Sequence, residues 1–276
     1  MSEATLPECQ ALLLRRDGWR LHVTLNRPEA RNAMSFAMVR ELSAVFDAVA
    51  DDRSLRAIVL RGADGNFCAG GDIKDMAAAR GAEPGQGGKD PLAAGNRLFG
   101  AMLTRVESAP QAVIAVLEGA VLGGGFGLAC VADVAIARAD ASFGLPETGL
   151  GFPPAQIAAF LVRRIGLAQA RRLAVTGGRF DGRVARELGV VHSVCVDDEG
   201  ITREVDATLA QIRRCAPGAI AATKHIMAQV GAMDLERVLD YAAAVFATAV
   251  RGPEGSEGTM AFLHKRTPAC ADGTDR

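Results

Sequence analysis

The sequence predicts an α/β protein whose mixed core is followed by a region made of helices alone. Short apolar runs alternate with helical patterns as far as about residue 198, and only helical patterns remain beyond it. Two glycine-rich segments, residues 67–76 and 118–134, each lie where a strand should end and a helix begin. We therefore divide the chain into a core, residues 1–198, and a helical C-terminal region, residues 199–276.

The first elements of the core are a hairpin and a capped helix. Asp17-Gly18 is a strong turn dipeptide, and it joins strands at 12–15 and 20–25. Ser35 is a typical N-cap residue and predicts a helix over 36–50. The following segments are predicted in the same way: a strand at 56–60, a glycine-rich loop at 62–71, helices at 73–79 and 92–106, and a buried strand at 112–116.

The second half of the chain continues with short strands and then with helices. Strands are expected at 134–137 and 141–143, and helices at 123–131, 154–165, 168–176, 182–188, 201–214, 217–230, 234–250 and 253–264. Residues 80–91 are rich in glycine, proline and charge and predict a surface loop. A lid over a site and a plain connector are both open for this loop.

The composition is that of an ordinary globular protein, with 49% hydrophobic and 23% charged residues. The net charge of −1 argues against a broad nucleic-acid-binding surface. The six cysteines form no CxxC pair, and no histidine lies at metal-ligand spacing, so we expect reduced thiols in a cytoplasmic protein and no metal. The longest charge-free stretch near the glycines, 119–132, is too short to cross a bilayer.

The two glycine-rich segments indicate a site for an anion. Glycine allows tight turns and close approach of the backbone to a ligand. A helix start presents unpaired N–H groups, and the helix dipole favours negative charge there. Two such N–H groups converging on one point would form an oxyanion hole, which suits a carbonyl that becomes an enolate or a tetrahedral oxyanion. Close packing of a helix on a strand would explain either segment alone equally well.

Other catalytic patterns are missing, which leaves a carboxylate as the acid or base. The sequence has no GxxxxGK[ST] and no GxSxG, and its four histidines are scattered. Glu147 follows Pro146 in the segment GLPETGLGF. A carboxyl group partly desolvated there would have a raised pKa suited to proton transfer, whereas a solvated loop glutamate would not.

Taken together, these segments resemble the crotonase superfamily, which is the enoyl-CoA hydratase/isomerase family. The similarity is carried by LNRPEARNAMSFAM at 25–38, FCAGGDIKDM at 67–76, GAVLGGGFGLACVADVAIA at 119–137, FGLPETGLGFPP at 143–154 and AFLHKRTP at 261–268. It covers nearly the whole chain. The resemblance implies a crotonase fold, a spiral of ββα units stacked in two roughly perpendicular sheets, with C-terminal helices for trimerisation. It also implies an acyl-CoA substrate, no separate cofactor, and a homotrimer or a dimer of trimers.

The same resemblance implies roles for individual residues. The backbone N–H groups of Gly71 and Gly124 would form the oxyanion hole, and Glu147 would exchange a proton with the α-carbon of the thioester. Coenzyme A would lie along Ala69, Gly71, Asp72, Ile73, Lys74 and Gly124, with Arg27 and Ala30 near its adenine and phosphates and with Phe262 and Lys265 reaching it from a neighbouring subunit.

Gly127 is the main departure from the family pattern, because ordinary enoyl-CoA hydratases resemble this chain but have a second glutamate there. Three readings follow. GGFGLAC and PPAQIAAFLVRRIG are similar to a single-glutamate branch of methylglutaconyl-/isohexenylglutaconyl-CoA hydratases. A Δ3–Δ2 enoyl-CoA isomerase needs only one base. A non-catalytic acyl-CoA- or RNA-binding paralogue is the third. The acyl group and the choice between trimer and hexamer stay open.

Overall fold

The computed structural model describes residues 4–82 and 90–271. Its larger sheet has six strands in the order β1-β2-β3-β4-β6-β9: β1 Leu12–Asp17, β2 Arg20–Leu25, β3 Ala57–Gly62, β4 Ala112–Leu117, β6 Val134–Arg138 and β9 Ser193–Cys195. Only the β1–β2 pair is antiparallel. A smaller sheet has the order β5-β7-β8: β5 Ala120–Leu122, β7 Ser142–Gly144 and β8 Arg179–Phe180.

The helices occupy most of the chain between and after these strands. They are α1 Phe36–Val49, α2 Ile73–Arg80, α3 Pro91–Ser108, α4 Gly124–Val131, α5 Ile157–Thr176, α6 Gly182–Glu187, α7 Asp198–Arg213, α8 Pro217–Gln229, α9 Leu235–Arg251 and α10 Pro253–Leu263. Three short 3-10 turns are η1 Pro28–Ala30, η2 Ala63–Gly65 and η3 Thr148–Leu150.

Local sequence signals explain where the first elements begin. Gly18 has a φ of 55° between β1 and β2, as the hairpin prediction requires. Ser35 accepts a hydrogen bond from the Met38 N–H through its hydroxyl oxygen at 3.1 Å, so it caps α1 as predicted. The predicted hairpin and capped helix are therefore confirmed.

Some predicted boundaries were wrong. The helix expected from residue 154 begins only at Ile157, because two prolines precede it. The two helices expected at 154–165 and 168–176 form one span, α5, broken at Gly166 with φ 76° and ψ 159°. Strands β5, β8 and β9, each only two or three residues long, were not predicted. Within the loop predicted at 80–91, residues 83–89 lie outside the described part of the chain.

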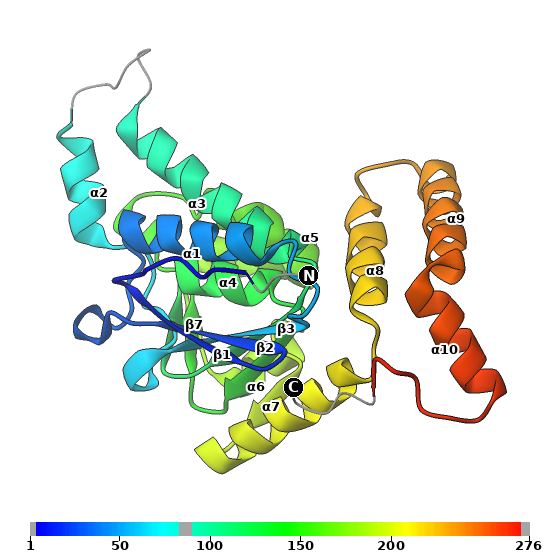
Figure 1. Ribbon diagram of the computed structural model, residues 1–276. Helices are drawn as coiled ribbons and strands as arrows, with labels where there is room; N and C mark the ends of the chain where they lie inside the picture. The colour runs from blue at the N-terminus through cyan, green and yellow to red at the C-terminus, as the bar shows by residue number, and fades with distance from the viewer. Residues whose placement is uncertain (1–3, 83–89, 272–276) are drawn as a thin grey trace.

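The larger sheet is covered on both faces, as expected of a mainly parallel sheet. Residues of β4 alternate between two apolar clusters: Val113, Ala115 and Leu117 face α1, α3 and α4, whereas Ile114 and Val116 face α7. Figure 1 shows α1, α3 and α4 on one side of the sheet and α7 on the other. This sheet fixes the strand ends from which the two glycine-rich segments start.

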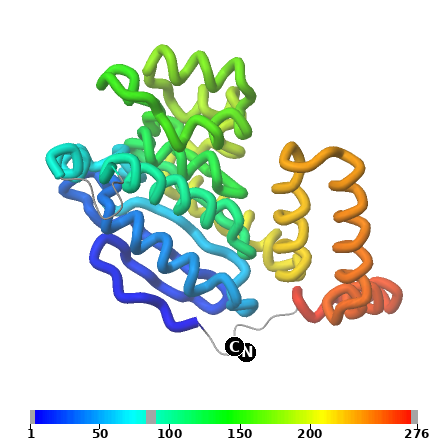
Figure 2. Tube along the Cα trace, turned by 90° about the horizontal axis from the view of Figure 1, so that it is seen from above, coloured from blue at the N-terminus to red at the C-terminus, as the bar shows by residue number. Residues whose placement is uncertain are grey.

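Helices α8, α9 and α10 project from this body as an arm, which Figures 1 and 2 show standing beside the sheet layers. The Lys224 ammonium on α8 anchors the arm, because it lies 2.6 Å from Asp133 Oδ2 and donates to the Gln111 carbonyl at 2.9 Å. Large apolar side chains of the arm are exposed: Met227, Val230, Leu235, Leu239, Phe246, Phe262 and Leu263. The domain division at residue 198 stays a prediction, and α7 on the C-terminal side of it packs on the sheet.

Candidate active site

The structure brings the two glycine-rich segments together. The Cys68 N–H donates to the Ala120 carbonyl at 2.8 Å, and the Leu122 N–H donates to the Cys68 carbonyl at 2.9 Å. These bonds align the segment after β3 with β5, which leads directly into α4. Residues that are far apart in sequence therefore end at the same place.

Glycine is required at the point where the two segments touch. Gly70 has a φ of 104°, and Gly123 has a φ of 47°. Both values lie in the region that residues with a side chain rarely adopt. A Cβ on Gly70 would also lie 3.4 Å from the Leu122 carbonyl oxygen. The next residues in each segment, Gly71 and Gly124, both line the same cavity.

The N–H groups of Gly71 and Gly124 are not used by the bridge and the helix in which these residues lie. Gly71 forms a parallel bridge with Met34, whose two hydrogen bonds use the Gly70 carbonyl and the Asp72 N–H. The N–H of Gly71 itself therefore points away from Met34. Gly124 is the first residue of α4, and the N–H groups of a first helical turn have no partner within the helix. Gly124 thus lies at a helix start, where negative charge is favoured, and Gly71 lies two residues before the start of α2.

Glu147 lies on the opposite side of this meeting point, between β7 and η3. Its side chain is partly buried, and burial raises the pKa of its carboxyl group above the ordinary value. Oε2 is buried and has no hydrogen-bond partner among the described residues. Oε1 lies close to the bare backbone of Gly123. A carboxyl group with a raised pKa and an unused oxygen is suited to carry a proton.

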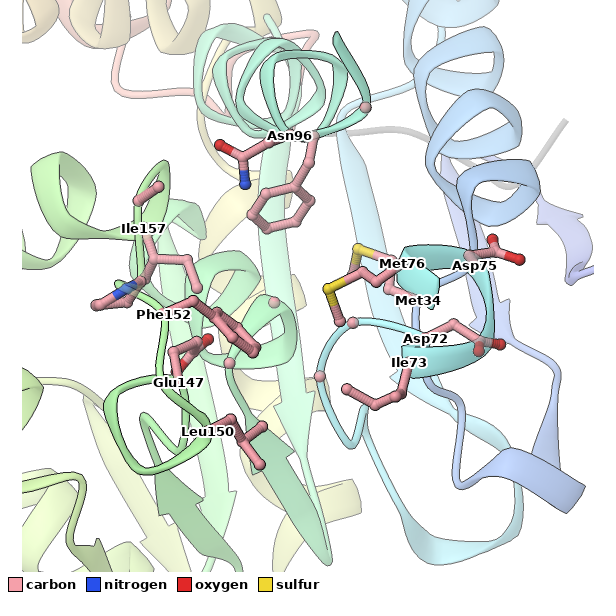
Figure 3. Close-up of a pocket in the computed structure, with 18 of the residues that line it drawn as sticks. Met34, Asp72, Ile73, Asp75, Met76, Asn96, Glu147, Leu150, Phe152 and Ile157 are labelled. Atoms are coloured by element: carbon pink, nitrogen blue, oxygen red, sulfur yellow. The ribbon is translucent and has the colours of Figure 1, made fainter. Parts of the chain in front are cut away.

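A cavity of about 960 Å³ contains these groups. Figure 3 shows Glu147, Leu150, Phe152 and Ile157 on one side of it, and Met34, Asp72, Ile73, Asp75 and Met76 on the other, with Asn96 of α3 above them. Most of these side chains are apolar, which suits a largely hydrophobic ligand held by a few polar groups.

Gly127 lies on α4 and does not itself line the cavity, but it packs beneath Phe99 and Ile157, which do. A Cβ at this position would be 3.3 Å from Ile157 Cγ1, 3.3 Å from Leu103 Cδ1 and 3.4 Å from Phe99 Cζ. Apolar side chains thus surround the place where ordinary hydratases were expected to have a second glutamate. Of the other lining carboxylates, Asp72 pairs with Arg27, and Asp75 accepts from the Phe36 N–H at 2.7 Å.

The structure gathers only part of the site predicted from the sequence. The residues that line the cavity are Ala69, Gly71, Asp72, Ile73, Gly124 and Glu147. The residues that do not line it are Arg27, Ala30, Lys74, Phe262 and Lys265. The role of each residue stays a prediction. A residue outside the cavity can still contact coenzyme A, because coenzyme A is too long for the cavity to hold all of it.

Arg27 does not line the cavity, but it forms an ion pair with Asp72, which does. Its guanidinium lies 2.8 Å from Asp72 Oδ2 and donates to the Ala33 carbonyl at 2.6 Å. Asp72 also accepts from the Lys74 N–H at 2.9 Å and so caps α2. These hydrogen bonds, with the nearby positive charge, hold the pKa of Asp72 below its ordinary value although burial opposes them. Arg27 therefore ties the first loop to the start of α2.

The C-terminal residues lie elsewhere. Phe262 on α10 is 83% exposed, and Lys265 follows that helix with a φ of 52°. Neither reaches the cavity of its own chain.

Sequence reasoning missed several lining residues, among them Arg31, Phe99, Gln156 and Arg179. Arg31 follows η1 with a φ of 49°, so its side chain leaves the loop in a direction that sequence does not reveal. Phe99 lies within a helix that was predicted, but only the packing of α3 on α4 places its ring beside Gly124. A glycine-rich neighbourhood was the one signal available, and it gives no side-chain direction.

The described residues offer neither a metal site nor a membrane-spanning helix. No group of three or more His, Cys, Asp or Glu side chains in the described ranges is arranged to hold a metal ion. None of the helices in those ranges has both the length and the apolar composition needed to cross a bilayer.

Comparison with known proteins identifies the family. The enoyl-CoA hydratase/isomerase family model matches residues 21–273. The structure of Pseudomonas aeruginosa AtuE is 59% identical, with a TM-score of 0.92 over 95% of this chain and 100% of that chain. An enoyl-CoA hydratase/isomerase from Marinobacter aquaeolei is 53% identical, with a TM-score of 0.92 over 96% of this chain and 100% of that one.

A relative with a more specific name is the 2,3-dehydroadipyl-CoA hydratase of Escherichia coli (strain K12). It is 32% identical over 270 residues, which cover 97% of this chain and 98% of that protein. The similar structures confirm the crotonase fold expected from the sequence. The chain therefore belongs to the enoyl-CoA hydratase/isomerase family of enzymes.

Proposed function

We propose that this protein is an enoyl-CoA hydratase that adds water reversibly to an α,β-unsaturated acyl-CoA thioester. The observation that carries the proposal is the position of Glu147. Its partly buried carboxyl group has an unpartnered oxygen and lies beside Gly123, next to the N–H of Gly124. A proton carrier and an anion site are thus adjacent, as a reaction through an enolate requires.

In the proposed reaction the N–H groups of Gly71 and Gly124 donate to the thioester oxygen. The Glu147 carboxylate takes a proton from water, whose oxygen bonds to the β-carbon as the C=C electrons move toward the thioester oxygen. The resulting enolate is stabilised by the two N–H donors. The protonated Glu147 then delivers its proton to the α-carbon, so the glutamate returns to its starting state. Dehydration is the reverse.

One glutamate serves both proton transfers in this scheme, and Gly127 is the reason. Its surroundings of Ile157, Leu103 and Phe99 give no second carboxylate at that position. This supports the single-glutamate branch that resembles methylglutaconyl-/isohexenylglutaconyl-CoA hydratases. The name of the E. coli relative, a 2,3-dehydroadipyl-CoA hydratase, also supports an acyl group that carries a second carboxylate.

We also propose that coenzyme A enters along Ala69, Asp72 and Ile73, which line the cavity. Arg27, Ala30 and Lys74 would then contact the parts of coenzyme A that lie outside the cavity. Phe262 and Lys265 would act in a homotrimer or a dimer of trimers, where α10 of one copy approaches coenzyme A of another. The exposed apolar residues of the arm support such an assembly.

A Δ3–Δ2 enoyl-CoA isomerase is the second candidate. Gly127 favours it, because a 1,3-proton shift needs one base and an oxyanion hole but no water-activating partner. The presence of Glu147 in the cavity argues against a paralogue that only binds acyl-CoA or RNA.

The test is a panel assay of the purified protein with crotonyl-CoA, 3-methylglutaconyl-CoA and a 3-enoyl-CoA, each followed by absorbance and mass. A gain in mass of one water on an enoyl thioester would support the hydratase. A change in absorbance without a change in mass, on the 3-enoyl-CoA alone, would instead establish the isomerase.

A further inference from the structure

Arg179 is the one cationic residue of the cavity on the side that holds Glu147, among the described lining residues. The other lining residues of that side include Leu122, Pro146, Glu147, Leu150, Phe152, the turn 153–155, Gln156 and Ile157. The two other lining arginines, Arg31 and Arg80, come from η1 and α2 on the opposite side.

The smaller sheet fixes the position of Arg179. Strand β8 pairs with β7, so that Arg179 is directly opposite Gly144, shortly before Glu147. A Cβ on Gly144 would lie 3.3 Å from Arg179 Cγ and 3.5 Å from Leu122 Cδ2. A Cβ on Gly177 would lie 3.2 Å from Thr148 Oγ1. The segment that carries Arg179 therefore runs beside the segment that carries Glu147, and the arginine stem passes over a glycine next to Leu122.

The side chain of Arg179 is exposed to solvent and makes no polar contact with the rest of the described chain. Among the residues that the structure describes, no ion pair and no hydrogen bond engages it, although other arginines such as Arg27 and Arg61 are paired. A guanidinium presents a planar set of donors that matches a carboxylate in a bidentate manner. Arg179 is exposed and lines the cavity beside mainly apolar residues, so its guanidinium can meet an anionic group of a ligand that occupies the cavity.

We propose that Arg179 binds a carboxylate at the far end of the acyl group and so makes the enzyme selective for thioesters of dicarboxylic acids. This inference rests on the proposed function. The anion could in principle come from the acyl group or from coenzyme A phosphate. Arg179 favours the acyl group, because it lies beside Gly144 and Leu122 close to the reacting centre. The phosphates of coenzyme A are separated from the thioester by the whole pantetheine arm.

Binding of saturated thioesters tests this inference without turnover. Calorimetry would compare glutaryl-CoA, butyryl-CoA and coenzyme A, which share the CoA part and differ in the carboxylate. We expect Arg179→Gln to raise the dissociation constant for glutaryl-CoA at least fivefold. The dissociation constants for butyryl-CoA and coenzyme A should stay within twofold of those of the unmodified protein. Arg179→Lys should retain most of the preference because it keeps the charge. Arg171→Gln, on an exposed position of α5 outside the cavity, is the matched control.

Equal weakening of all three ligands would show that Arg179 binds phosphate, and no weakening of any would show that it binds neither; each result overturns the proposal. Turnover provides a second readout with glutaconyl-CoA and crotonyl-CoA. Arg179→Gln should raise KM for glutaconyl-CoA at least fivefold at similar kcat and leave crotonyl-CoA unchanged. If the unmodified enzyme hydrates no thioester, the proposed function fails, while the calorimetry still decides the role of Arg179.

Discussion

Glu147 and Gly123 are packed so closely that a side chain at position 123 would displace the carboxylate. A Cβ there would lie 2.7 Å from Glu147 Oε1, which is closer than real Cβ contacts. Gly123 also has a φ of 47°, so the same residue forms the turn into α4 and leaves space for Glu147. The oxyanion donor and the proton carrier of the proposed site are therefore positioned by one glycine.

The first prediction follows from this contact. Gly123→Ala should lower kcat by at least about a hundredfold, because a displacement of about 1 Å at a reacting group has an effect of that size. Gly149→Ala is the control, since Gly149 lies in η3, two residues after Glu147, and has no atom within 4 Å of its Cβ position. Steady-state kinetics of both variants would check it. Similar activity of the two would contradict the contact.

Removal of the proton carrier is the second prediction. Glu147→Gln keeps the size of the side chain and removes its acid–base function, so turnover should fall at least about a hundredfold. Binding of a saturated acyl-CoA should stay within about threefold in calorimetry, because the carboxylate is not a predicted contact of coenzyme A. Full activity would remove Glu147 from the mechanism.

The third prediction concerns pH. Burial raises the pKa of Glu147, and both directions of the proposed reaction start from its carboxylate. Activity should therefore fall as pH is lowered, with an inflection above the ordinary glutamate value of about 4.3.

The contribution of Glu147 to folding stability should depend on pH in the opposite direction to its contribution to activity. Because the folded state favours the protonated form, the contribution of Glu147 to stability is full below the unfolded pKa and is lost as pH rises through the folded pKa. Glu147→Gln should therefore raise the melting temperature at pH 8, and the gain should vanish near pH 4. A gain that is independent of pH would contradict the raised pKa.

The fourth prediction isolates a backbone donor. Gly124→Pro removes the N–H at the first position of α4, where proline is otherwise tolerated, and should lower kcat by roughly a hundred- to a thousandfold. Gly124→Ala keeps the N–H, and its Cβ would be 3.5 Å from Phe99 and 3.7 Å from Met34 Sδ, which are ordinary contacts. It should keep kcat within about tenfold. Circular dichroism would check the fold of both, and equal losses of kcat would disprove donation by this N–H.

The fifth prediction is that Gly127→Glu does not restore a two-glutamate site without a loss of stability. The new side chain would enter among Ile157, Leu103 and Phe99, and burial of an unpaired polar group costs about 1–3 kcal/mol in proteins. Gly127→Ala, the control, adds only a methyl group, and the helix propensity that it gains, about 1 kcal/mol, offsets part of an overpacking cost of about 1–3 kcal/mol, so it should lose less stability than Gly127→Glu. Urea denaturation at pH 8 and pH 4 would measure both, and the loss for the glutamate should shrink at pH 4 as it is protonated.

The sequence predicted the elements of the core better than the geometry of its site. The turn at Gly18, the cap at Ser35 and the run of β4 are local patterns, and the structure has them as expected. Strand β8 is only two residues long and gains its place by pairing with β7. Arg179 therefore could not be found from the sequence, because its position depends on that pairing.

The exposure of α2 has a consequence for the volume of the cavity. This helix has no fully buried residue and is held at its start by the Asp72–Arg27 ion pair and the Met34–Gly71 bridge. Few buried contacts mean a small free energy of local opening, so α2 should exchange its amide hydrogens sooner than α1 or β4. Glu147 lies on the other side of the cavity, where Gly123 in the buried turn before α4 holds it. Local opening of α2 should therefore change the volume of the cavity without moving Glu147 away from Gly123.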